Sequence, residues 1–140
     1  MNDKSFPVEL VTPEGHLFGG HSEFVAIPAY DGEMGFAYLR APVISSLGEG
    51  EMRVHIPDSD KIERFVLQGG FASTDGETLV VLASRAQRLD AYEITSVTER
   101  RTGIEQRIEA AQDDDPELPF LKDELSWVML VQRLVGRAKL

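Results

Sequence analysis

In the first part of the chain, apolar residues alternate with polar ones over short runs that end at turn residues. Phe6, Val8 and Leu10 show this period of two, and the run ends at the turn 12–15. Further strands are predicted at 24–27, 43–47, 52–56, 62–67, 71–73 and 79–83, of which 24–27 and 79–83 are fully apolar. Asp75 and Gly76 separate the last two runs and favour a β-hairpin. Turns spaced about every 8–12 residues are typical of a β-sandwich or a barrel.

Glycines predict where several of these strands end. The run that begins at Leu17 is expected to stop at Gly19–Gly20, and the glycines of 31–35 are expected to bracket a tight loop. Gly69–Gly70 could indicate a phosphate-binding loop, but it lacks the Lys and Ser or Thr of such a loop, and no helix follows it. We therefore interpret it as a strand bend where two backbones approach closely.

After Ala83 the apolar period becomes helical. A single stripe is formed by Ile94, Val97, Ile104, Ile108 and Ala111, with Arg101 in the gap between Val97 and Ile104. The segment 113–116 ends in proline and breaks this helix, and a second helix is expected from Pro119 to about Lys139.

These two periods predict a β + α fold: an antiparallel β-sandwich followed by an antiparallel two-helix hairpin. We expect the sandwich domain to span residues 1–88 and the helical hairpin to span residues 89–140.

The second predicted helix has two unusual features. Trp127 to Val131 is an uninterrupted apolar run, which covers more than one face of a helix. From Leu125 to the last residue there is no acidic side chain, whereas Arg133, Arg137 and Lys139 are basic. Two interpretations stay open: the second apolar face packs on the sandwich, or the helix docks into an acidic, apolar groove of a partner.

Composition excludes several classes of function. The chain has 140 residues, of which 42% are hydrophobic, and a formal charge of −10. This charge argues against binding to nucleic acid or to anionic lipid, because both require clustered basic residues. With no cysteine, the chain has no disulfide framework, thiolate metal site or cysteine nucleophile. No signal peptide or membrane-spanning run is predicted, so a role at a membrane would require a partner.

Candidate chemistry in the sequence is sparse. His16, His21 and His55 match no tight metal-ligand spacing, and we interpret them as surface residues. The acidic residues that could be interpreted as a paired-carboxylate site are Asp31, Glu33, Glu49 and Glu51. They stand beside turn glycines, where acidic residues are simply soluble. We expect no metal, no cofactor and no catalytic residue.

The ordered segments of the first half resemble the epsilon subunit of bacterial F-type ATP synthases. The matching segments, in order, are 8–15, 17–20, 31–35, 41–47, 50–53, 65–71 and 80–83. Two predicted helices of the right length follow them.

The resemblance implies a non-catalytic central-stalk subunit of a proton-translocating complex, peripheral to the cytoplasmic face of the bacterial membrane. It implies a sandwich that binds the gamma subunit and rests on the ring of c subunits, with Asp31, Glu33 and Arg40 as the expected contacts. It also implies that the helical hairpin moves. When extended it would reach the catalytic beta and alpha subunits and inhibit ATP hydrolysis through Trp127, Met129, Arg133 and Arg137.

The sequence departs from the family pattern at two places. The family's Tyr-Pro-(Gly or Asn)-His stretch is replaced by Ala37-Tyr38-Leu39-Arg40. The acid and arginine of its ATP-binding helix signature are replaced by Thr95 and Thr98, so we expect ATP binding to be weak or absent. Two other classes stay open: a stand-alone sandwich that binds a ligand, such as a cupin-like enzyme, and a structural adaptor outside any ATP synthase.

Overall fold

The computed structural model describes residues 4–138, which form two compact units that meet between Arg88 and Leu89. The first unit contains only strands and the second only helices.

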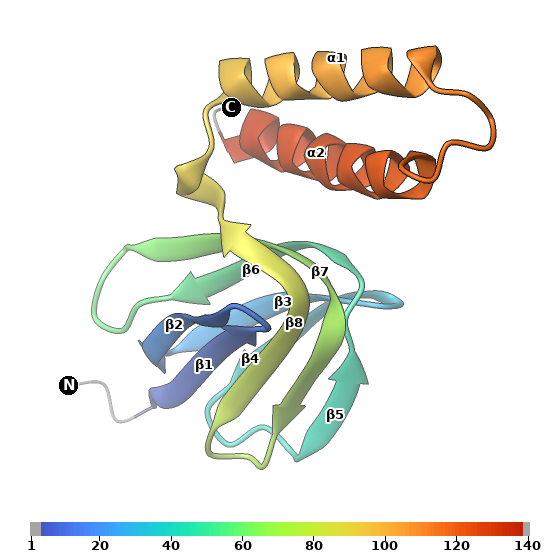
Figure 1. Ribbon diagram of the computed structural model, residues 1–140. Coiled ribbons are helices and arrows are strands. Elements are labelled where there is room, and N and C mark those ends of the chain that lie inside the picture. Colours follow the sequence, from blue (N-terminus) through green and yellow to red (C-terminus); the bar gives the residue numbers. More distant parts are fainter. Residues whose placement is uncertain (1–3, 139–140) are drawn as a thin grey trace. The chain divides into compact units, whose positions relative to one another are not determined.

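The first unit is a twisted β-structure of eight strands (Figure 1). The strands are β1 (Phe6–Thr12), β2 (Gly15–Ser22), β3 (Phe24–Ala29), β4 (Gly32–Ala37), β5 (Val43–Ser46), β6 (Glu49–His55), β7 (Ile62–Thr74) and β8 (Leu79–Arg88). Their order is β2-β1-β8-β7-β6-β3-β4, and β5 also pairs with β7. Neighbours run antiparallel except β1 and β8, which are parallel. The predicted sandwich is therefore confirmed, with one parallel pair that the long connection between its first and last strands permits.

β7 joins the two parts of this structure because it bends at Gly69–Gly70. Residues 62–68 pair with β6, whereas residues 71–74 pair with β5. Both glycines have positive φ, and a Cβ on Gly70 would collide with the carbonyl oxygen of Leu82. The predicted close approach of two backbones is confirmed, and only glycine fits there.

Other glycines did not end strands as expected. β2 continues through Gly19–Gly20 to Ser22, paired with β1 along its length. Gly32 to Gly35 belongs to β4 and not to a loop, so the turn between β3 and β4 is only Tyr30–Asp31. Ladder hydrogen bonds to a neighbouring strand outweigh the weak intrinsic strand preference of glycine at these positions.

The core of the sandwich consists of the inward side chains of the strands. Its largest fully buried members are Phe36, Phe65, Leu10, Ile27 and Met52. Since packed interiors are nearly as dense as organic crystals, the unit behaves as a rigid body.

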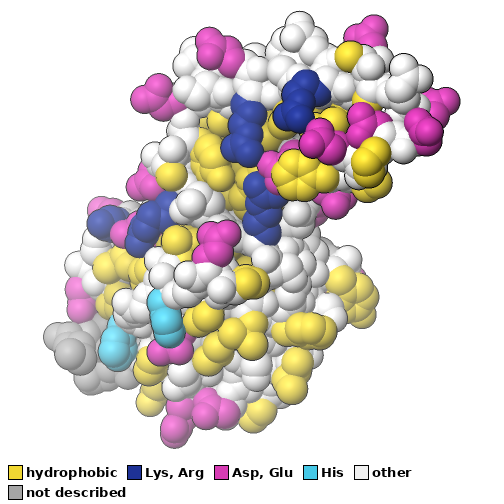
Figure 2. Space-filling model, in the orientation of Figure 1, with side chains coloured by type: hydrophobic (Ala, Val, Ile, Leu, Met, Phe, Trp, Pro, Cys, Tyr) yellow, Lys and Arg dark blue, Asp and Glu magenta, His cyan; other side chains and the backbone are white. Residues whose placement is uncertain are grey.

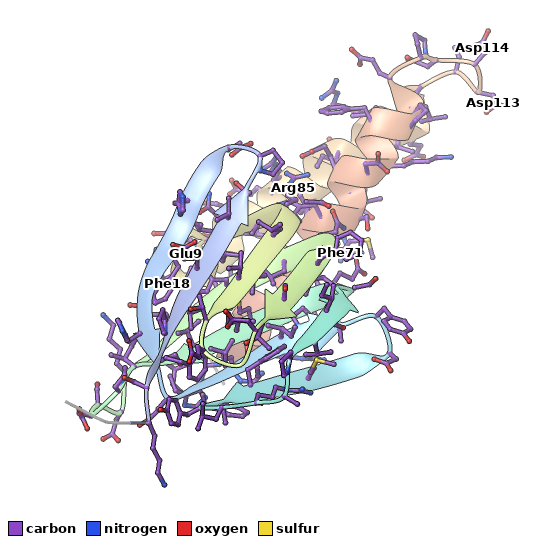
Figure 3. All side chains as sticks on the ribbon, turned by 90° about the horizontal axis from the view of Figure 1, so that it is seen from below. Glu9, Phe18, Phe71, Arg85, Asp113 and Asp114 are labelled. Carbon is purple, nitrogen blue, oxygen red and sulfur yellow. The ribbon has the colours of Figure 1, made fainter. Side chains whose placement is uncertain are left out.

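The second unit is a helical hairpin. A short 3₁₀ turn, η1 (Leu89–Ala91), leads into α1 (Ile94–Ala110), which is followed by α2 (Leu118–Ala138). Asp113 and Asp114 lie in the loop that joins the helices (Figure 3). Val97 and Ile104 of the predicted stripe are buried. The second helix begins one residue before Pro119, and Lys139 lies outside the described residues.

Candidate functional site

One outward face of the sandwich is apolar. Phe71 of β7 and Leu82 of β8 are directly paired across the strands, and Ile44 of β5 is opposite Ser73, two residues from Phe71. Because alternate residues of a strand point to the same side, the three side chains share one face. Their exposed fractions are 74% for Ile44, 56% for Phe71 and 52% for Leu82. We call Ile44, Phe71 and Leu82 the apolar face. Figure 3 labels Phe71, and Figure 2 shows hydrophobic side chains on the surface of the strand unit.

The sequence of β8 explains why this face is unusual. A sheet with one solvated side normally alternates apolar residues with polar ones. In β8 the run from Leu79 to Ala83 has no polar residue, although Leu82 is exposed. This run was predicted as an apolar strand, without an exposed apolar side. The missing alternation was the signal of a second surface that requires cover.

The predicted contact residues Asp31, Glu33 and Arg40 lie near the β3–β4 hairpin but do not form one cluster. Asp31 is exposed in the turn, and Glu33 of β4 pairs with Arg53 of β6 at 2.7 Å. The Nε atom of Arg40 donates to the carbonyl oxygen of Gly35 at 3.1 Å, and its guanidinium lies 5.1 Å from the ring centroid of Phe36. Arg40 therefore contacts the backbone of β4 and not the carboxylate of Glu33.

Glu33 belongs to a chain of ion pairs that the sequence analysis missed. Arg53 bridges Glu33 and Glu51, and Arg64 of β7 also pairs with Glu51, at 3.1 Å. The hydrogen bond with Glu33 is the main cause that raises the pKa of Arg53, and burial opposes it. The carboxylates of Glu33 and Glu51 therefore belong to a structural network across β4, β6 and β7 and do not form an acid–base pair.

On α2, the side chain of Trp127 is buried and that of Met129 is exposed. Trp127, Val128, Leu130 and Val131 are buried, whereas Met129 is exposed. Arg133 and Arg137 are also exposed and follow Met129 at intervals of four residues, which places them on the same helix face. We call Met129, Arg133 and Arg137 the basic stripe. In the described conformation, therefore, the stripe is accessible to a partner and Trp127 is not.

Three arginines of α1 bind side chains of α2 or of the residue just before it. Arg100 pairs with Glu124 at 2.9 Å and Arg107 with Glu117 at 3.3 Å. The Nη1 atom of Arg101 donates to Oε1 of Gln132 at 2.6 Å, and Gln132 in turn donates to the hydroxyl of Thr98. Arg107, near the end of α1, pairs with the residue just before α2, whereas Arg100 and Arg101, nearer the start of α1, pair further along α2. This pattern is that of two antiparallel helices. We call these three cross-helix contacts the arginine clasp.

The hairpin has a small cavity and an open groove that bear on nucleotide binding. A cavity of about 110 Å³ is bordered by Tyr92, Val97, Arg100, Trp127 and Val131, among others. Typical small-molecule pockets begin at about 300 Å³. An open groove of about 350 Å³ is bordered by Arg100, Arg107, Phe120 and Glu124, among others, and both of its arginines already pair with carboxylates.

Residues 4–138 contain no candidate metal site, because no three His, Cys, Asp or Glu side chains come together there in a way that could hold a metal ion. His55 packs edge-on against Phe24, with ring centroids 5.6 Å apart. Among the described helices, none is both long enough and apolar enough to cross a bilayer.

Comparison with known proteins identifies a family and relatives that are similar to this chain. Residues 5–89 match the model of the family described as "ATP synthase, Delta/Epsilon chain, beta-sandwich domain". The chain is 27% identical to the ATP synthase epsilon chain of Ligilactobacillus salivarius, over 96% of each chain. It is 37% identical to that of Carboxydothermus hydrogenoformans, over 67% of this chain and 68% of the relative.

Solved structures share the fold at low sequence identity. A chain of the Euglena gracilis mitochondrial ATP synthase, solved with OSCP, F1 and the c ring, superposes with a TM-score of 0.66 at 15% identity. That match covers 96% of this chain and 79% of the other. A chain of the central stalk and c ring of the Tetrahymena thermophila mitochondrial ATP synthase gives a TM-score of 0.54 at 11% identity, covering 93% and 96%.

Proposed function

The chain belongs to the ATP synthase delta/epsilon family, and from that premise we propose that it is a non-catalytic stalk subunit whose sandwich binds gamma through the apolar face. The observation that carries this proposal is the exposure of Ile44, Phe71 and Leu82 on adjacent strands. Covering apolar surface contributes about 25 cal/mol per Å² removed from water. A rotor also requires a rigid link between its parts, and a packed sandwich provides one.

The c ring is the second partner in this proposal, and it places the subunit at the cytoplasmic face of a bacterial membrane. The β3–β4 turn supports this contact because Asp31 is exposed there and Glu33 stands next to it on β4. Short acidic segments pair well with basic loops of a partner. The network around Arg53 holds Glu33 in a fixed position, which favours a defined contact over a diffuse one.

The hairpin inhibits ATP hydrolysis in this proposal, and the exposed basic stripe supports that role. The whole chain carries −10, yet this face of α2 presents two arginines beside an exposed methionine. A helix with that pattern fits an acidic, apolar groove of the catalytic subunits. The subunit acts there by blocking movement and contributes no catalytic group.

Binding to gamma tests the main proposal directly. Phe71→Gln replaces an exposed side chain, so the fold should persist, and affinity for an alpha–beta–gamma complex lacking this subunit should fall at least about tenfold. Phe120→Gln is the matched control, because Phe120 is also exposed but lies on α2. Equal losses for both variants, or no loss for Phe71→Gln, would exclude the apolar face as the gamma site.

A further inference from the structure

The turn between β4 and β5 holds a leucine in an unfavourable backbone conformation. The turn is Ala37 to Arg40, closed by a hydrogen bond from the Arg40 amide to the Ala37 carbonyl at 3.2 Å. Leu39 has a φ of 60°, in the left-handed region. Glycine, asparagine and aspartate enter this region readily, whereas a bulky side chain there is an outlier.

Comparison with Asp58 shows how unusual this is. Among residues 4–138, Leu39 and Asp58 are the two non-glycine residues with positive φ. Asp58 lies in the β6–β7 turn and is of a type that tolerates the conformation. Leu39, by contrast, is of a type that the left-handed region disfavours.

Nothing in the fold of the sandwich compensates for Leu39. Its side chain is 63% exposed, and that of the preceding Tyr38 is 43% exposed. A strained residue that packed into the core would be offset by burial, but these two side chains point outward. Strained conformations that no contact within the protein offsets are typical of binding sites.

The turn is nevertheless firmly held. Arg40 donates to the Gly35 carbonyl and stacks its guanidinium on Phe36. On the other side, a Cβ on Gly76 would lie 3.2 Å from the Arg40 carbonyl oxygen, so the β7–β8 turn packs against it. Tyr38 and Leu39 are therefore presented on a preorganised support, which lowers the entropy lost on binding.

The position of the turn indicates what covers it. It leads into β5, whose first residue Val43 pairs with Thr74 beside the β7–β8 turn. Ile44 of the apolar face is the next residue of β5. The exposed pair Tyr38–Leu39 thus lies shortly before Ile44 along the chain, and Ile44 is the β5 residue of the face assigned above to gamma.

We infer that Tyr38 and Leu39 form a second anchor for gamma. Their side chains insert into an apolar recess of gamma, beside the gamma surface that covers Ile44 and Phe71. This inference rests on the proposed function. It assigns Leu39 a role in affinity that conflicts with stability, because the same side chain strains the free subunit and contributes apolar area in the complex.

Leu39→Asn tests this conflict, since asparagine tolerates the left-handed region and removes the apolar side chain. The thermal midpoint of the isolated chain should rise by about 2–6 °C. Affinity for an alpha–beta–gamma complex lacking this subunit should fall at least about fivefold. Asp58→Asn is the matched control and should leave this affinity unchanged. Tyr38→Ser should weaken binding while leaving the midpoint within about 1 °C.

The outcomes separate this inference from the function on which it rests. If the unmodified chain fails to bind the complex, the proposed function is wrong. If the chain binds but Leu39→Asn and Tyr38→Ser bind equally well, gamma binding stands and the second anchor is refuted. A Leu39→Asn variant that loses both stability and affinity would also refute it, because Leu39 would then be a structural residue. If the variants lose affinity only for the isolated c ring, the second anchor for gamma is also refuted.

Discussion

Arg53 fixes Glu33 across an intervening strand: its Nη2 atom lies 2.7 Å from Oε1 of Glu33. Glu33 stands on β4 and Arg53 on β6, and β3 pairs with both strands between them. The side chain of Glu33 is still 56% exposed. The carboxylate is thus oriented by the sandwich and accessible to a partner at the same time.

This orientation gives a crosslinking prediction. Glu33→Cys should form crosslinks with the polar loops of the c ring in the assembled complex, because the β3–β4 hairpin faces that ring in our proposal. The loss of an exposed ion pair should change the free energy of unfolding by less than about 1 kcal/mol. Glu14→Cys, in the β1–β2 turn, is the control and should not crosslink to c. Crosslinks from Glu33→Cys to the catalytic subunits alone would contradict the assigned orientation.

The sandwich should lose stability in acid partly through Glu63. Its pKa lies below the ordinary value of 4.5, chiefly because Lys61 hydrogen-bonds to it and also because Arg88 does, while burial opposes both. A depressed folded-state pKa stabilises the fold above the unfolded-state value of about 4.5, and this contribution is lost as pH falls through the folded-state pKa. Glu63→Gln should therefore flatten the decline of the urea midpoint below about pH 4.5. A decline as steep as in the unmodified chain would exclude Glu63 as a source of the acid sensitivity.

The architecture could be predicted from the sequence because the type of each element follows from the spacing of its apolar residues. Alternation in 6–10 and 52–56 and the helical stripe of Val97 and Ile104 are local signals, and each element formed where its period indicated. The strand lengths were less predictable. Gly19–Gly20 and Gly32 to Gly35 lie within strands because hydrogen bonds from a neighbouring strand hold them, and that neighbour is not a local feature of the sequence.

The surfaces depend on relationships between distant residues. Phe71 and Leu82 become one apolar face only through the register of β7 and β8, and Glu33 meets Arg53 only across β3. Sequence spacing does not contain either fact. The strain at Leu39 had a visible trace, since the stretch departs from the family pattern there, but the sign of φ required the structure.

Two glycines should respond in opposite ways to alanine. Gly103 lies inside α1, and an added Cβ would meet no atom within 4 Å. Gly103→Ala should therefore stabilise the hairpin by about 0.5–1 kcal/mol through its higher helix propensity. Gly70→Ala should cost about 3 kcal/mol or more, because the Cβ would collide with the Leu82 carbonyl at a residue with positive φ. Chemical unfolding of both variants checks this contrast, and a destabilised Gly103→Ala would show that Gly103 has a packing role.

ATP should bind the isolated subunit weakly or not at all. The arginine clasp occupies Arg100, Arg101 and Arg107 with partners on α2 or just before it, so a triphosphate would have to break these contacts before using the cations. Calorimetry with ATP should detect no binding in the low micromolar range. Glu124→Gln weakens the hold on Arg100 and should raise the affinity if Arg100 is the limiting donor. A low micromolar dissociation constant for the unmodified chain would contradict this prediction.

Removing α2 should activate ATP hydrolysis. A chain truncated before Leu118 keeps the whole sandwich, so it should still assemble with gamma while losing the basic stripe. Arg133→Ala with Arg137→Ala should reproduce part of the increase, because each charge-assisted contact in a desolvated interface contributes about 1.5–3 kcal/mol before desolvation is subtracted. A net difference of about 1.4 kcal/mol shifts a two-state switch tenfold. The difference between this double variant and the unmodified enzyme should shrink at high salt, where exposed charges are screened. Lys61→Ala removes an exposed charge from the sandwich and should leave hydrolysis unchanged. Unchanged hydrolysis in both the truncated and the double-arginine enzymes, with normal assembly, would show that the hairpin is structural in this protein and that its exposed arginines have another partner.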